Sequence, residues 1–114
     1  MKYRVEVTAA AQSDAEAAYQ WLAARTVHAA RWFNGLVEAI ESLDAFPTRW
    51  PLARESAEFD EPIYQLLYGK SPHVYRVLFI VREDVVYVLH VRHGARQAMK
   101  RGEVELPPER GTPH

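Results

Sequence analysis

The sequence predicts an α+β domain in which a pair of N-terminal helices packs on one face of an antiparallel β-sheet. The first residues alternate polar and apolar side chains, as a half-buried strand does. Two amphipathic helical segments then follow in direct succession, and the last third of the chain holds runs of β-branched and aromatic residues separated by short polar breaks. These three observations give the element order β-α-α-β-β-β.

Length and composition indicate what kind of protein this is. A chain of 114 residues is long enough for one hydrophobic core, and 48% hydrophobic with 25% charged residues is typical of soluble domains. We expect residues 1–101 to form a single domain and residues 102–114 to form a flexible C-terminal tail. No apolar signal core or 18-residue apolar run occurs, so a cytoplasmic protein without a membrane segment is expected. The absence of cysteine excludes disulfides and thiolate metal sites.

The N-terminal half is predicted as a strand followed by a helical hairpin. Residues 2–8 alternate in the strand pattern, and Thr8 can cap a helix that runs from about residue 9 to 25. A second amphipathic helix follows from about 27 to 45 and ends where Pro47 cannot continue it. So short a connection predicts that the two helices lie antiparallel.

The C-terminal half is predicted as a three-stranded meander. A short strand covers residues 63–68, and two longer strands, 73–82 and 85–92, form a hairpin that turns at Glu83 and Asp84. Both long strands are apolar on their two faces, which predicts that they are central in the sheet. The helices then cover one face, and the other is expected to be partly open as a cleft.

Charge is distributed unevenly along the chain. Residues 1–60 hold six Lys/Arg and nine Asp/Glu, whereas residues 68–101 hold seven Lys/Arg and two Asp/Glu. The net charge is only -1, yet the second segment predicts a basic face suited to phosphate or to an acidic partner. A solvated charged surface is the alternative.

The hairpin predicts which charged side chains can meet. A two-residue turn that pairs Arg82 with Val85 also pairs Val74 with His93, which makes Arg76 and His93 diagonal neighbours on one face of the sheet. One additional residue in the turn would instead exchange the two faces of the second strand and move His93 to the other face.

This face carries the predicted catalytic residues Arg76, His93 and Arg96. Arg76 can bind a phosphate through two parallel hydrogen bonds, His93 can transfer a proton near neutral pH, and Arg96 adds a second positive charge. Phosphodiester cleavage needs such a set and requires no metal or other cofactor. Nearby residues predicted to bind nucleic acid are Lys70, Tyr68, Tyr75 and Arg92.

Structural roles remain open for the same side chains. Arg76 could instead pair with an acidic residue across the sheet edge; the candidates are Glu58, Asp60 and Glu61. His93 could bond to the backbone at a strand end, and His90 is expected to be a core histidine. The aromatic residues of the helices are expected to pack internally; they are Tyr19, Trp21, Trp32 and Phe33. No histidine spacing typical of a metal site occurs.

The chain resembles the RelE/ParE superfamily of toxins from bacterial type II toxin–antitoxin modules. The resemblance rests on the strand 74–79, the acidic turn and the closing segment 86–96, which reads VYVLHVRHGAR. The helix end at residues 43–47 and the strand 64–68 are also similar. The resemblance covers roughly residues 2–97 and implies the same β-α-α-β-β-β order.

The resemblance implies a toxin with one of two activities. RelE-like members are mRNA interferases: these endoribonucleases cleave messenger RNA on the ribosome by attack of a 2′-hydroxyl on the adjacent phosphate. ParE-like members bind and poison DNA gyrase without hydrolytic chemistry. A cognate antitoxin holds either kind inactive in a heteromeric complex. In this resemblance Arg76 matches the arginine of a Tyr-Arg strand, and His93 with Arg96 matches the closing basic segment.

Of the two activities, metal-independent mRNA cleavage is the first expectation, and gyrase inhibition is the alternative. Three departures from the RelE pattern favour the alternative. The strand 64–68 lacks lysine, no tyrosine follows Arg96, and the net charge is low for a protein that docks on ribosomal RNA.

Overall fold

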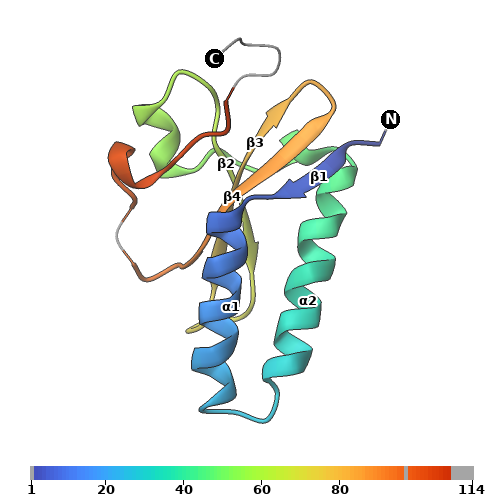
Figure 1. Cartoon of the computed structure of the whole chain (residues 1–114), viewed down its shortest axis with the longest axis vertical. Helices are drawn as coiled ribbons and strands as arrows, with labels where there is room; N and C mark the ends of the chain where they lie inside the picture. The colour runs from blue at the N-terminus through green and yellow to red at the C-terminus, as the bar shows by residue number, and fades with distance from the viewer. Residues whose placement is uncertain (1, 97, 109–114) are drawn as a thin grey trace.

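The computed structural model describes residues 2–96 and 98–108, and Figure 1 shows the predicted α+β fold with the element order β-α-α-β-β-β. The helices and strands, in chain order, are β1 (Arg4–Val7), α1 (Ala9–Ala23), α2 (Ala29–Glu41), β2 (Tyr64–Tyr68), β3 (Tyr75–Arg82) and β4 (Val85–His93). Four short 3-10 helices connect them: Ser42–Asp44, Pro47–Arg49, Arg54–Glu58 and Arg101–Glu103.

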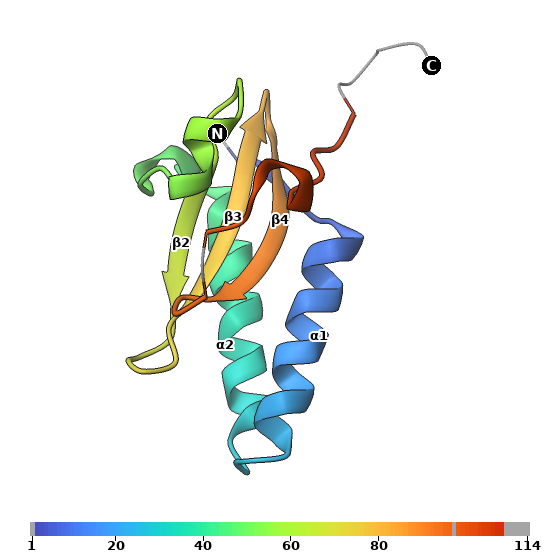
Figure 2. The same ribbon diagram turned by 90° about the vertical axis from the view of Figure 1, so that its left-hand side faces the viewer.

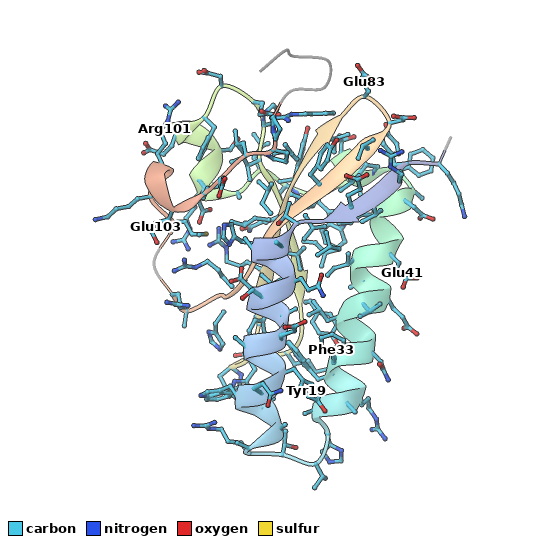
Figure 3. The ribbon with its side chains drawn as sticks, in the orientation of Figure 1. Tyr19, Phe33, Glu41, Glu83, Arg101 and Glu103 are labelled. Atoms are coloured by element: carbon cyan, nitrogen blue, oxygen red, sulfur yellow. The ribbon has the colours of Figure 1, made fainter. Side chains whose placement is uncertain are left out.

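The helical hairpin forms as predicted. The Thr8 hydroxyl caps α1 by accepting a hydrogen bond from the Ala11 N–H, and it also donates to the Val88 carbonyl of β4, 2.9 Å away. The rings of Tyr19 and Phe33 meet edge to face between the two helices, with centroids 5.6 Å apart (Figure 3). The cap therefore fixes where α1 leaves the sheet, and ring packing fixes α2 against it.

The sheet has the strand order β1-β4-β3-β2. The three C-terminal strands are antiparallel as predicted, but β1 pairs parallel to β4 and makes the sheet mixed. The two helices and two strands lie between β1 and β4 in sequence, so no tight turn forces this pair to run antiparallel. The alternating pattern of β1 predicts a strand but carries no information on its direction.

The β3–β4 hairpin turns where the sequence predicts, at the outer tip that Glu83 marks in Figure 3. Arg82 pairs with Val85, and the predicted register holds for four pairs. A β-bulge then places Leu89 as an extra residue in β4, so that Leu78 pairs with His90.

The bulge overturns the predicted contact between Arg76 and His93. His93 pairs with Tyr75 instead of Val74, and Arg76 pairs with Arg92. Successive residues of a strand point to opposite faces, so Arg76 lies on one face of the sheet and His93 on the other. The prediction that these two side chains share a ligand is therefore wrong.

Both faces of the sheet are covered. The helices bury one face, with Leu36, Val77 and Phe79 at its centre. The C-terminal segment crosses the other face (Figure 2), where Met99 and Val104 are 6% and 5% exposed. The C-terminal segment therefore covers much of the face that was expected to be partly open, and the packed region continues past residue 101, where the flexible tail was expected to begin. Residues 109–114 of that tail lie outside the described residues.

No helix in residues 2–96 and 98–108 has the length and apolar character needed to cross a membrane.

Candidate functional site

Arg76 is an internal residue of the sheet. Its side chain is 4% exposed and forms a bidentate ion pair with Glu55, in which Nη1 lies 3.1 Å from Oε2 and Nη2 bonds to Oε1. The third guanidinium nitrogen, Nε, donates to Oε1 of Gln65 at 3.0 Å. Each guanidinium nitrogen of Arg76 therefore already has a partner inside the fold, and burial keeps the group away from a phosphate in solvent. The ion pair agrees with the structural alternative that the sequence left open for Arg76. Its partner is Glu55, however, and not one of the three predicted candidates, Glu58, Asp60 and Glu61.

Glu55 connects three parts of the chain. It lies on the short helix 54–58, pairs with Arg76 of β3 and accepts a hydrogen bond from the Met99 N–H at 2.9 Å. Burial by itself raises the pKa of Glu55, but the hydrogen bonds and the positive charge of Arg76 outweigh burial and lower the pKa below its ordinary value. The carboxylate stays ionised, and it holds the C-terminal segment on the sheet.

A groove of about 770 Å³ lies between α1, the end of β4 and the C-terminal segment. It brings together four of the seven predicted site residues, namely Tyr75, Arg92, His93 and Arg96. Five further polar or aromatic residues that the sequence did not single out as functional also line it: Asp14, Trp21, His73, His90 and Glu103. We call this the α1–β4 groove.

His93 is fixed in one tautomer. Its Nδ1 accepts a hydrogen bond from the Ala95 N–H at 3.1 Å, so the neutral ring carries its proton on Nε2. The ring contacts Tyr75 on one side and His73 on the other, with centroid distances of 5.1 and 6.0 Å. The arrangement leaves Nε2–H as the hydrogen-bond donor that His93 can offer to a ligand.

His90 is fixed in the opposite tautomer. Its Nδ1 lies 2.9 Å from Oδ2 of Asp14, which also accepts the Val91 N–H at 3.0 Å. A carboxylate can only accept, so Nδ1 of the neutral ring is the donor and Nε2 is the acceptor. The sequence predicted a core histidine, and His90 is indeed 9% exposed. Its partner could not be foreseen, because the extra residue at Leu89 moves His90 to the face of β4 opposite the predicted one.

Trp21 corrects the prediction that every helix aromatic packs internally. Its side chain is 45% exposed at the end of α1, the Arg25 guanidinium carbon lies 4.0 Å from its ring centroid, and the His73 ring lies 6.2 Å away. The spacing of Asp14 and Trp21, seven residues apart, places both on one helix face. That spacing is the one sequence signal that could have predicted that Asp14 and Trp21 line the same groove.

The remaining predicted residues divide between the groove and the rest of the molecule. Arg92 lies 3.7 Å from Glu103, and Arg96 is exposed. Tyr68 and Lys70 are outside the groove lining; the Tyr68 hydroxyl donates to the Trp32 carbonyl at 2.7 Å beneath α2.

The two predicted tyrosines have raised pKa values. Burial raises the pKa of Tyr75, and burial together with the negative charge of Glu38 raises that of Tyr68. Both phenols therefore stay protonated at neutral pH. Within residues 2–96 and 98–108 no group of three or more His, Asp or Glu side chains is placed to hold a metal ion.

Comparison with known proteins agrees with this architecture. A family model described as "ParE toxin of type II toxin-antitoxin system, parDE" matches residues 5–98. A solved structure titled "Chromosomal ParDE TA system from P. aeruginosa" is similar in fold, with a TM-score of 0.64 at 15% identity, and the match covers 81% of this chain and 96% of that chain. No curated protein sequence matches significantly. Because the family match spans most of the chain, the protein belongs to the ParE toxin family of type II toxin–antitoxin systems.

Proposed function

We propose that this toxin acts by binding its target and not by cleaving RNA, and that the target is DNA gyrase, as for ParE-like members of the superfamily. The observation that carries the proposal is the burial of Arg76. Arg76, the arginine that matches the Tyr-Arg strand, is 4% exposed, and each of its three guanidinium nitrogens already donates to Glu55 or Gln65. It therefore cannot stabilise the charge that develops on a phosphate during cleavage.

The state of His93 supports the same proposal. Attack by a 2′-hydroxyl needs a base that accepts its proton. Neutral His93 carries a proton on Nε2, and its Nδ1 is occupied by the Ala95 N–H. The raised pKa of Tyr75 keeps the neighbouring phenol protonated as well, so neither group offers a free acceptor.

One observation favours RNA cleavage as a second candidate. Asp14 holds the His90 ring so that Nε2 is free to accept a proton, as in a general base. His90 also lines the same groove as His93, which carries a donor. A cleaving site at this position would use His90 as the base and His93 as the acid. Because His90 pairs with Leu78 and His93 with Tyr75, the two rings point to opposite faces of β4 and would meet a substrate from either side of this strand.

The two candidates give different results when the toxin is induced in bacterial cells. A gyrase poison is expected to induce the DNA-damage response while bulk transcripts stay intact, and the purified toxin should increase cleaved plasmid DNA in a gyrase reaction. A ribonuclease would stop translation promptly and cut transcripts, and this result would overturn the proposal. His90→Gln separates the two further: it should leave a gyrase poison toxic and should inactivate a His90-dependent nuclease.

A further inference from the structure

We propose that the α1–β4 groove binds single-stranded nucleic acid, with a phosphate held by His93 and Arg96 and a base stacked against Trp21. This inference goes beyond the proposed action on gyrase and does not depend on it. A strand in the groove could be DNA exposed in the gyrase complex or an RNA, and the two are distinguished by the test below.

The groove presents donors, because its acidic groups already have partners. Asp14 accepts from His90 and from the Val91 N–H. Glu103 accepts the Lys100 N–H at 3.0 Å and lies 3.7 Å from Arg92. These contacts satisfy the carboxylates within the chain and reduce their repulsion of an anion.

Two donors close together in the chain, on His93 and Arg96, are available to a ligand. The Ala95 N–H fixes the proton of neutral His93 on Nε2, and Arg96 is exposed and forms no ion pair with the described residues. Both residues line the groove, and Gly94 between them approaches the Val74 carbonyl so closely that an added Cβ would lie 3.0 Å from it. This close approach fixes the backbone that carries the two donors. A phosphate needs such a pair of donors, one of them charged.

Planar rings extend from these donors to the surface. His93 contacts His73, and His73 contacts Trp21, with ring centroids 6.0 and 6.2 Å apart. Trp21 is 45% exposed, and the Arg25 guanidinium lies against it. Aromatic rings beside cations are the usual platform for unpaired bases, because every base has a face that can stack.

This combination favours a single strand over an acidic peptide or a duplex. A carboxylate would use the donors but would leave the exposed indole without a stacking partner. A duplex keeps its bases stacked internally and offers only its backbone. Only a single strand provides both the phosphate and the base.

The test is fluorescence anisotropy of the purified full chain with labelled 12-mers of thymidine and of uridine, a matched blunt duplex and a poly-glutamate peptide. We expect either 12-mer to bind more tightly than the duplex or the peptide. Trp21→Ala should weaken binding about 5- to 150-fold, the range found for removal of a stacked base contact. Arg96→Ala should weaken it and reduce the dependence of log K on log salt by about 0.7, as expected for one phosphate on a single strand.

Arg31→Ala is the matched control, because Arg31 is an exposed arginine of α2 outside the groove lining. It should leave affinity unchanged, and thermal unfolding should confirm that all variants are folded. Preference for thymidine would point to DNA and preference for uridine to RNA; both support the site. No binding of either 12-mer, equal binding of the duplex, or affinity unaffected by Trp21→Ala would overturn it. Gyrase inhibition is measured separately, so either proposal can fail alone.

Discussion

At the scale of single residues, the buried pair of Arg76 and Glu55 gives the clearest stability prediction. Arg76→Met leaves the Glu55 carboxylate buried without its counter-charge, so it should lower the free energy of unfolding by about 3–5 kcal/mol. Urea unfolding measures the change. Arg82→Ala, which removes a partly exposed ion pair with Glu61, is the comparison and should cost about 1 kcal/mol or less.

The double variant Arg76→Met, Glu55→Gln tests the cause of that loss. It removes both charges but keeps an amide oxygen that can still accept the Met99 N–H. If the unpaired Glu55 carboxylate causes the instability, the double variant should recover roughly half or more of the lost unfolding free energy. A double variant no more stable than Arg76→Met alone would mean that lost packing, and not the charge, dominates.

The lowered pKa of Glu55 predicts how stability depends on pH. A carboxyl whose pKa is lower in the folded state binds its proton more tightly when unfolded. Its contribution is therefore fully present above the unfolded value of about 4.3 and is lost as the pH falls through the lower folded value. Urea unfolding between pH 6 and pH 2 should show this loss in the natural chain. In the Arg76→Met, Glu55→Gln variant the free energy of unfolding should fall less steeply as the pH is lowered. The same dependence on pH in both chains would contradict the role given to Glu55.

At the scale of elements, the sequence predicted the helices, strands and turns whose positions depend on local residue pattern and turn chemistry. Thr8 marks the start of the helical hairpin, and the polar break at Glu83 and Asp84 marks the turn of the β-hairpin. The second helix ends at Glu41, earlier than Pro47 suggested, and short 3-10 helices follow it. The bulge at Leu89 could not be predicted, because β4 is apolar on both faces and a shift of one residue leaves its pattern unchanged. The predicted site failed at that point, since its main contact depended on the register beyond the bulge.

The C-terminal segment gives a prediction of its own. Met99, Val104 and Leu106 cover the face of the sheet around Leu78 and Ile80. A chain ending at residue 98 should therefore lose several kcal/mol of unfolding free energy, since each buried side chain of this size contributes about 1.5–3 kcal/mol. A chain ending at residue 108 keeps all three side chains and should be as stable as the full chain. Equal stability of both truncated chains in urea would show that the segment does not contribute to the fold.

At the scale of the whole molecule, the uneven charge along the chain is used mainly for internal contacts. The basic C-terminal strands meet acidic residues from elsewhere in the chain: Arg76 pairs with Glu55, Arg82 with Glu61 and Arg92 with Glu103. The charge count suggested a broad basic face, but a count along the chain does not show which cations are already paired. The pairings leave a small donor site in the α1–β4 groove, and binding there should depend only weakly on salt.

The decisive prediction at this scale is that a folded chain without the buried Arg76–Glu55 ion pair is still toxic. Because Arg76 acts through the fold and not on a ligand, the Arg76→Met, Glu55→Gln variant should arrest growth as the natural toxin does. Growth after induction measures this effect, and protein levels in the same cells show whether the variant accumulates. An antitoxin supplied from a second plasmid should restore growth equally for both chains, which shows that the arrest is specific. A variant that accumulates and binds the antitoxin but does not arrest growth would assign Arg76 a direct role in toxicity, and the proposal of a binding toxin that does not use this arginine would then be wrong.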